Sequence, residues 1–246
     1  MDMNFIHLSD TPSFCYTDCA SIFSSPYLID SAKVIDSTVT VFKKYFKIPT
    51  EPLFIINNHP DFSVPLTAAL KHCIFLTVSA PPEGGGYWSQ FVYQFSHEFC
   101  HYLIFHPVPG KFRWLEESIC ELASHFFLLK VAEHWAVDPP YEHFRSFAPC
   151  HMAYELDIRK CDSDFSISSL FIPHSKLLES LEHDEYQRQL NRNIALKLLP
   201  FFIDNPNLWN IIHYLPDLSV NNGLLENMQF LQDTSKQPIC DIMLTL

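Results

Sequence analysis

The sequence lacks the features that direct a chain to a membrane or to nucleic acid. Its first residues carry no basic region followed by an apolar stretch and a small-residue cleavage site, so we predict no signal peptide. No apolar run approaches the roughly 20 residues that cross a bilayer. Basic residues are few: the chain has 16 Lys and Arg residues and 28 Asp and Glu residues. The resulting net charge of −12 repels a phosphate backbone. We therefore expect no membrane partner and no nucleic-acid partner.

The rest of the composition is that of a globular protein. The chain has 246 residues, of which 48% are hydrophobic, so it is long and apolar enough to bury a core. Its eight cysteines are scattered, and several fall inside apolar helix or strand patterns. Without an export signal, this usage indicates reduced, mostly buried thiols and cytoplasmic residence. Cys15 and Cys19 form a C-x3-C pair that has no obvious second half, so they are weak candidates for a metal clip.

Proline and glycine divide the chain into predicted elements. Residues 1–24 show no clear periodicity, and Gly84-Gly85-Gly86 forms a break that we interpret as a flexible lead-in to the following helix. We predict helices at 27–46, 87–105 and 112–135, strands at 53–57 and 73–79, and further helices near 141–160, 174–203, 206–214 and 223–232. The fold class is therefore α+β. It consists of a small mixed sheet with a backing helix and two further helices, followed by a mainly α-helical C-terminal part.

The helix at 87–105 contains the motif His97-Glu98-Phe99-Cys100-His101. Residues four apart share one face of a helix, so both imidazoles can bind one zinc ion. Glu98 lies one step round the helix, close enough to polarise a zinc-bound water without ligating the metal. The alternative is a solvated polar face, but Tyr93 and Ile104 flank the histidines and favour a face turned towards a cleft.

A third ligand is expected, because catalytic zinc commonly has three protein ligands and a water. On the next helix, Glu117 and Glu121 lie on the face opposite the apolar stripe, whereas Glu116 points about 100° away from Glu117. Helical spacing alone allows either carboxylate of that face to turn towards the histidine pair.

The HExxH motif followed by Trp114-Leu115-Glu116-Glu117-Ser118 resembles the gluzincin metallopeptidases, the group of thermolysin and the aminopeptidases. The resemblance implies that Glu117 is the third ligand and that Glu121 hydrogen-bonds a ligand histidine, which fixes the tautomer of that imidazole. Two departures are that Ser118 replaces the usual Gly and that the gap after His101 is shorter than the common one. Glu116 remains an alternative ligand.

The same resemblance implies further site residues. In the family an edge strand pairs with an extended peptide, and the corresponding strand here is 73–79, with Ile74, Leu76 and Val78 as substrate-binding residues. A Tyr or His from the C-terminal half stabilises the developing oxyanion. Tyr154 is the candidate for that role, and the alternatives are His151, Tyr141 and His143.

From these observations we predict that the protein is a zinc-dependent metallopeptidase. It is expected to bind one Zn2+ per chain, to use Glu98 as the general base, and to act on a peptide or protein substrate. We expect residues 1–135 to form a zincin-like catalytic subdomain and residues 136–246 to form a helical subdomain that closes the cleft. One alternative is a zinc amidase or esterase that acts on other substrates. Another is a helical interaction protein whose HExxH motif is vestigial.

Overall fold

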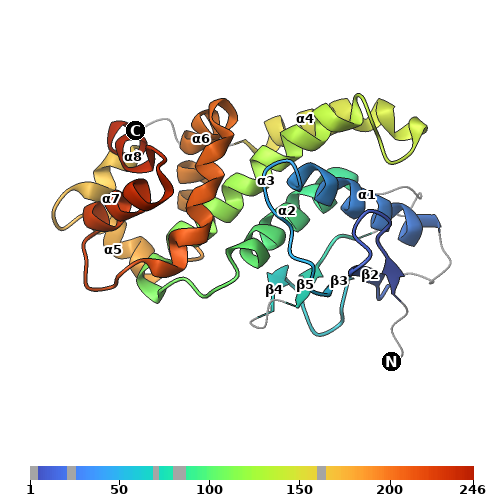
Figure 1. The fold of residues 1–246 in the computed structure, drawn as a ribbon, viewed down its shortest axis with the longest axis horizontal. Helices are drawn as coiled ribbons and strands as arrows, with labels where there is room; N and C mark the ends of the chain where they lie inside the picture. The colour runs from blue at the N-terminus through green and yellow to red at the C-terminus, as the bar shows by residue number, and fades with distance from the viewer. Residues whose placement is uncertain (1–4, 21–25, 69–71, 80–86, 160–164) are drawn as a thin grey trace. The chain divides into compact units, whose positions relative to one another are not determined.

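The computed structural model describes residues 5–20, 26–68, 72–79, 87–159 and 165–246, and Figure 1 shows their fold. The predicted break at Gly84-Gly85-Gly86 lies outside these ranges. The chain has the expected α+β class, with a small mixed sheet and a helical C-terminal part. It divides into two compact units, of which the first comprises Met1–Tyr102 with Phe127–Ile158 and the second comprises Leu103–Phe126 with Arg159–Leu246.

The first unit contains a five-stranded sheet in the order β1-β2-β3-β5-β4. The central strands β2 (Phe14–Asp18), β3 (Leu53–Asn57) and β5 (Cys73–Leu76) are parallel to one another. The two short edge strands, β1 (Ile6–His7) and β4 (Leu66–Thr67), are antiparallel to their neighbours. The prediction that the strand beginning at Cys73 forms the edge is therefore wrong, because β4 covers that side of β5.

Strand β2 was not foreseen, and its burial explains why. All five of its residues are buried, so the strand has no polar face to produce an alternating pattern. Its last residue, Asp18, is a buried acid whose carboxylate accepts hydrogen bonds from the side-chain amides of Asn57 and Asn58 and from the main-chain N–H of Ala20. These bonds satisfy a charge that would otherwise be costly to bury.

Helices α1 (Pro26–Phe42) and α2 (Trp88–Ile104) belong to the same unit up to Tyr102 and contribute aromatic side chains to its core. The rings of Phe14 on β2 and Phe42 on α1 both make edge contacts with Phe99 of α2. The apolar side chains of α2 that lie away from its histidine face are buried: Trp88, Phe91, Val92, Phe95, Phe99, Tyr102 and Leu103. Packing of these side chains leaves the histidine face of the helix on the other side.

The first unit continues through the end of α3 (Arg113–Trp135), a 3-10 helix η2 (Glu142–Phe147) and α4 (Ala148–Ile158). The single helix predicted at 141–160 is therefore two elements. Pro149 lies in the first turn of α4, a position at which its missing N–H costs nothing.

The second unit consists of helical elements. After η1 (Gly110–Phe112) and the first half of α3, it contains η3 (Ile167–Phe171), α5 (Lys176–His183), α6 (Arg188–Asp204), η4 (Pro206–Asp217), α7 (Leu224–Ser235) and α8 (Ile239–Thr245). Trp209 forms the centre of its core, where its ring makes edge contacts with Phe126 of α3 and Phe202 of α6. The helix predicted at 174–203 is divided into α5 and α6 at residues 184–187.

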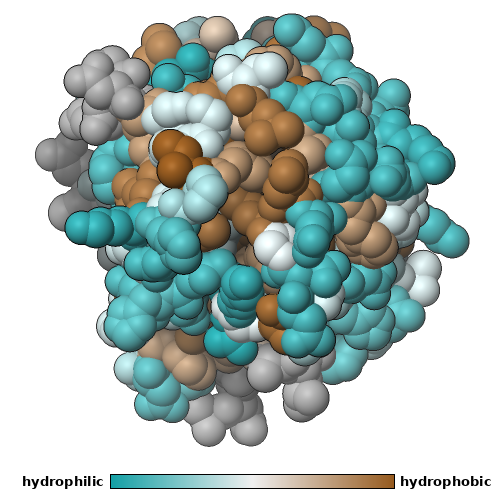
Figure 2. Space-filling model, turned by 90° about the vertical axis from the view of Figure 1, so that its left-hand side faces the viewer, coloured by the Kyte–Doolittle hydropathy of each residue, from teal (hydrophilic) through white to brown (hydrophobic). Residues whose placement is uncertain are grey.

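Some apolar side chains of the second unit remain exposed, including Leu225 and Phe230 on α7 and Leu244 on α8. Figure 2 views the side on which α5, α7 and α8 lie in Figure 1, and it shows hydrophobic residues gathered within a largely hydrophilic surface. Among the described helices, none combines the length and the apolar character needed to cross a membrane.

Candidate metal centre

The two histidines of the HExxH motif converge, as their spacing on α2 predicts. His97 Nε2 and His101 Nε2 lie 3.3 Å apart, and the two rings are inclined at 64° with their centres separated by 5.0 Å. Both side chains are half-buried. The helix keeps its regular form through the motif and ends at Ile104, just before Phe105 adopts a left-handed conformation with φ 63° and Pro107 prevents continuation.

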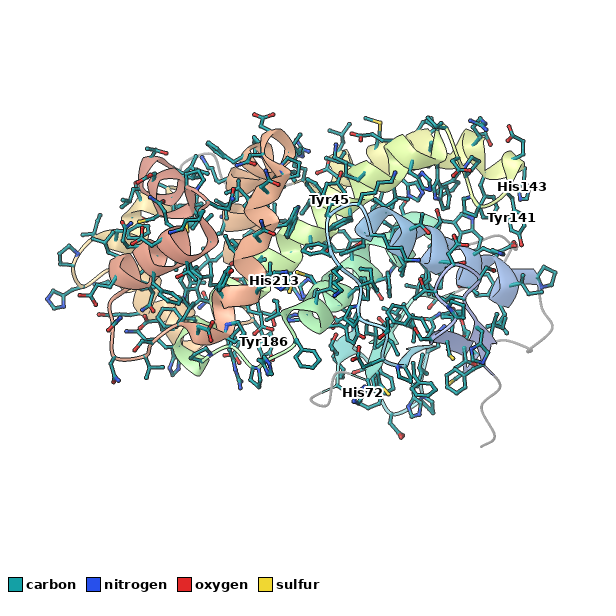
Figure 3. The ribbon with its side chains drawn as sticks, in the orientation of Figure 1. Tyr45, His72, Tyr141, His143, Tyr186 and His213 are labelled. Atoms are coloured by element: carbon teal, nitrogen blue, oxygen red, sulfur yellow. The ribbon has the colours of Figure 1, made fainter. Side chains whose placement is uncertain are left out.

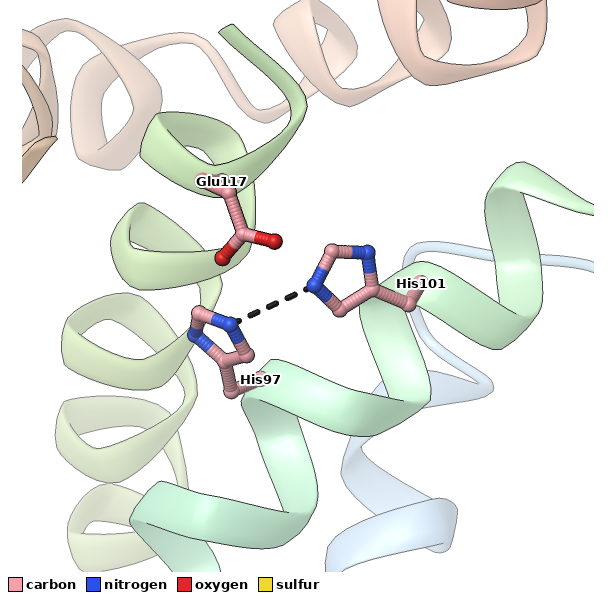
Figure 4. A group of neighbouring side chains, drawn as sticks. All are labelled: His97, His101 and Glu117. Carbon is pink, nitrogen blue, oxygen red and sulfur yellow. Dashed lines mark hydrogen bonds between the residues drawn. The ribbon is translucent and has the colours of Figure 1, made fainter. Parts of the chain in front are cut away.

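Glu117 on α3 completes the cluster, and Figure 4 shows its carboxylate facing the two imidazoles. Each of the three residues offers one ligand atom, and these atoms all lie within 4.8 Å of one another. Among the described residues, this is the group of His, Cys, Asp and Glu side chains that is close enough to hold a metal ion. Glu116, the alternative ligand, is not a member of it.

The donor set fits a zinc ion. Two imidazole nitrogens and one carboxylate oxygen are a typical ligand set of catalytic zinc, which keeps one position open. Two ligands bound at 2.0–2.1 Å to a tetrahedral ion are separated by about 3.3–3.4 Å. The observed 3.3 Å between the two imidazole nitrogens therefore requires no rearrangement of α2.

Glu98 directly follows His97 on α2 and is not a member of the cluster. The residue is buried, with 5% of its surface exposed. The single proton of the Thr67 hydroxyl is shared between two oxygens of Glu98, because Thr67 Oγ1 lies 2.7 Å from the main-chain oxygen and 3.0 Å from carboxylate Oε2. Glu98 is therefore a carboxylate adjacent in sequence to one histidine of the candidate cluster and outside the set of possible ligands.

The Glu121 carboxylate is held by partners that the sequence did not indicate. Its Oε1 accepts a hydrogen bond from Arg192 Nε at 2.8 Å, and the fully buried His125 Nε2 lies 3.7 Å from the same oxygen. Glu121 is four residues after Glu117 and is itself buried. An arginine on α6 therefore compensates the charge of an acid on the helix that carries Glu117.

A second bond between the same helices involves Ser118, the residue that replaces the Gly usual in gluzincins. Its hydroxyl donates to the main-chain oxygen of Trp114 at 2.7 Å and lies 3.2 Å from Asn191 Oδ1. The Asn191 side-chain amide in turn donates to the main-chain oxygen of Glu185. Two consecutive residues of α6, Asn191 and Arg192, thus contact α3 at Ser118 and at Glu121.

Tyr154 lies on α4, where its ring contacts that of Tyr93 at a centre separation of 6.2 Å. Tyr93 is one helical turn before His97 on α2. The alternative His151 is fully buried, and its Nδ1 lies 3.0 Å from Ser89 Oγ. Burial lowers the pKa of His151 to about 3, so this imidazole is neutral near pH 7.

The other aromatic candidates occupy different places. Tyr141 and His143 stack on each other at the start of η2 (Figure 3).

Tyr186, which the sequence did not single out, lies within the electrostatic reach of Glu117. Burial of part of the phenol, followed by the negative charges of Glu117 and Glu185, raises the pKa of Tyr186.

The side chains expected to bind substrate on β5 and after it are buried. Ile74 and Val78 are completely inaccessible, and Leu76 is 1% exposed. Strand β5 lies between β3 and β4, and β4 is paired with its residues Ile74 and Phe75, so β5 is not an edge strand. On this side of the sheet the edge strand is β4, which comprises Leu66 and Thr67 and whose free edge can receive another chain.

Comparisons with protein-family models, with curated proteins and with solved structures found no match to this chain.

Proposed function

We propose that this protein is a zinc-dependent hydrolase, and that its reaction is the cleavage of peptide bonds, as in the gluzincins that its motifs resemble. The observation that carries the proposal is the convergence of His97, His101 and Glu117, together with a buried carboxylate on the residue after His97, Glu98, that lies outside the ligand set. A structural zinc site needs no such carboxylate and commonly has four protein ligands. Three ligands with an adjacent acid favour a catalytic site.

In the proposed reaction a bound zinc ion would act as a Lewis acid, which would polarise a carbonyl and make water nucleophilic near neutral pH. The residues of the chain then have separate tasks. His97, His101 and Glu117 hold the ion. The Glu98 carboxylate takes a proton from the attacking water and later gives it to the leaving amine. We assign to the Tyr154 phenol the donation of a hydrogen bond to the oxygen that becomes negative.

A peptide substrate is favoured by the edge of the sheet in the first unit. Strand β4 is short, antiparallel to β5, and carries the residue that binds Glu98. An extended chain added at this edge would form main-chain hydrogen bonds next to the proposed base. An amidase or esterase acting on a small acylated compound would not need such an edge.

The experiment that tests the proposal has two steps. Metal content is measured by plasma mass spectrometry on protein prepared without a metal-affinity tag, and we expect about one zinc per chain. The zinc-loaded protein is then incubated with a library of quenched fluorogenic peptides and, in parallel, with a panel of small amides and esters. Cleavage confined to the small compounds would replace the peptidase with an amidase or esterase.

One observation favours a second candidate, a helical interaction protein with a vestigial motif. Leu225 and Phe230 are exposed on α7, next to the acidic residues Glu226 and Asp233. Exposed apolar residues with a charged rim are typical of protein-binding surfaces. Failure of the wild-type protein to retain zinc after loading and washing would favour this candidate over the hydrolase.

A further inference from the structure

The hydroxyl of Thr67 makes two contacts with one residue, Glu98. It lies 2.7 Å from the main-chain oxygen and 3.0 Å from the carboxylate Oε2. Thr67 is half-buried at the edge strand β4, and Glu98 is buried within α2. Both residues belong to the first unit. A single side chain thereby connects the edge of the sheet to both the backbone and the side chain of the proposed base.

This double contact restricts the position of the Glu98 carboxylate. A glutamate side chain has several rotatable bonds, and ordering it costs about 1–2 kcal/mol of conformational free energy. The Thr67 hydroxyl has one proton, which it shares between the main-chain oxygen, the nearer acceptor, and Oε2. The first contact places the hydroxyl relative to the axis of α2, and the second holds Oε2 next to the same hydroxyl. The end of the side chain is therefore tied to its own helix.

Thr67 is held in turn by the sheet. It is paired with Ile74 of β5, whose side chain is completely buried. Strand β5 is joined to α2 by a further hydrogen bond just after its last residue, since Thr77 N donates to Gln94 Oε1 at 3.1 Å. The hydroxyl that contacts Glu98 is consequently carried by a residue that is paired with the sheet.

We propose that Thr67 is a positioning residue for Glu98, and that it holds Oε2 so that Oε1 is the oxygen that accepts the proton. Within the described part of the chain, Thr67 is the hydrogen-bond donor found at this carboxylate, and it acts at Oε2. The catalytic part of the inference depends on the proposed hydrolase function. The positional part does not, because it concerns the conformation of Glu98 alone.

A purely structural role for Thr67 would give a different result. If the hydroxyl only attached β4 to α2, its loss would lower the stability of the fold or weaken substrate binding. A positioning role instead predicts a loss of turnover with substrate affinity retained, because the base is misplaced only with respect to the reacting water. Misplacement of a catalytic group by about 1 Å can cost on the order of 100-fold in rate.

The chain offers a matched control. Thr40 on α1 also places its hydroxyl between a helix carbonyl, Asp36 O at 3.0 Å, and a carboxylate, Asp10 Oδ2 at 3.2 Å. Thr67→Val and Thr40→Val remove the same group from the same kind of contact. Thr67→Ser retains a hydroxyl at the proposed site. If the valine variant folds poorly, the serine variant can still be compared with the wild type.

The experiment measures kcat and KM of zinc-loaded wild type, Thr67→Val, Thr67→Ser and Thr40→Val on a fluorogenic peptide that the wild type cleaves. We expect kcat of Thr67→Val to fall about 10- to 100-fold with KM and zinc content unchanged. Thr67→Ser should recover most of the loss, and Thr40→Val should match the wild type. A wild-type kcat in Thr67→Val, or a loss confined to KM, would overturn the proposal.

Crystal structures of the wild type and Thr67→Val separate this inference from the function. If the wild type binds zinc but cleaves no probe, the hydrolase proposal fails, and the conformation of Glu98 decides the positional claim. Displacement or disorder of the Glu98 carboxylate in Thr67→Val, with His97 and His101 unmoved, would support the claim. An unchanged carboxylate would contradict it.

Discussion

Arg192 on α6 donates a hydrogen bond from Nε to Glu121 Oε1 at 2.8 Å, four residues along α3 from the proposed ligand Glu117. The side chains of this pair are 26% and 11% exposed, so water screens the interaction only in part. The resemblance to gluzincins assigned the acid at this position to a ligand histidine. The arginine adds a role for Glu121 within the second unit, where it joins α3 to α6.

We expect Arg192→Met to destabilise the protein by about 1–3 kcal/mol, because it leaves a largely buried carboxylate without its cation. Zinc affinity should fall as well, since Glu121 shares a helix face with Glu117. Urea unfolding of the zinc-free protein and a zinc competition titration measure the two effects. Arg188→Met, which alters an exposed arginine on the same helix, serves as the control. Equal stability of the two variants would show that the pair contributes nothing.

Glu117→Ala should lose the bound zinc, whereas Glu116→Ala should retain it. The two residues are adjacent on α3, but only Glu117 belongs to the cluster with His97 and His101. The expected zinc content, measured by plasma mass spectrometry after exhaustive washing, is about one ion per chain for Glu116→Ala and close to none for Glu117→Ala. The reverse pattern would move the third ligand to Glu116.

Glu98→Gln should bind zinc normally and lose hydrolysis, because the amide keeps the shape of the side chain but cannot take up a proton. A positioned general base contributes about 100- to 10,000-fold to a rate, and a loss of this size in kcat is expected. Glu133→Gln, at an exposed position near the end of α3, controls for the change in net charge. Full activity of Glu98→Gln would require another base.

Two phenols can be compared as donors to the developing oxyanion. Tyr154→Phe should lower kcat about 100-fold, as the loss of one such donor does in other hydrolases, with zinc content unchanged. Tyr186→Phe is the informative comparison, because Tyr186 is influenced by the charge of Glu117. Normal kcat in Tyr154→Phe together with a loss in Tyr186→Phe would transfer the role to Tyr186.

His151 makes stability depend on pH. Its pKa is about 3 in the folded protein because of burial, against 6.5 for an ordinary histidine. Between pH 3 and pH 6.5 this histidine therefore binds a proton in the unfolded chain but not in the folded protein. Protonation stabilises the unfolded state increasingly as the pH falls below 6.5, so the folded protein becomes less stable. The free energy of unfolding should decrease by about 1.4 kcal/mol per pH unit through this group.

Urea unfolding at several pH values between 4 and 7 tests the effect. In His151→Gln, which keeps a polar contact for Ser89, this part of the slope should disappear. His143→Gln, at an exposed histidine on η2, should keep the wild-type slope. Parallel curves for wild type and His151→Gln would contradict the assignment.

The sequence alone determined the features of the site that depend on local periodicity. The helices around the motif were predicted to within one residue at each end, and the apolar side chains opposite the histidines of α2 are buried. The convergence of His97 and His101 follows from their spacing, because residues four apart in a helix must lie on one face. The same spacing placed Glu117 opposite the apolar stripe of α3.

Only the tertiary structure decided which elements meet. Helical spacing could not distinguish Glu117 from Glu121 as the candidate ligand, because the two residues share one face of α3. The packing of the helix selects Glu117 as the carboxylate that is grouped with the histidines. The order of the sheet likewise depends on long-range pairing, which buries β5 and leaves the two-residue strand β4 at the edge. Thr67 and Arg192 carried no sequence signal, since each acts through a single contact between segments that are distant in the chain. A periodic pattern specifies the face that an element buries, whereas packing specifies the partner against which that face is buried.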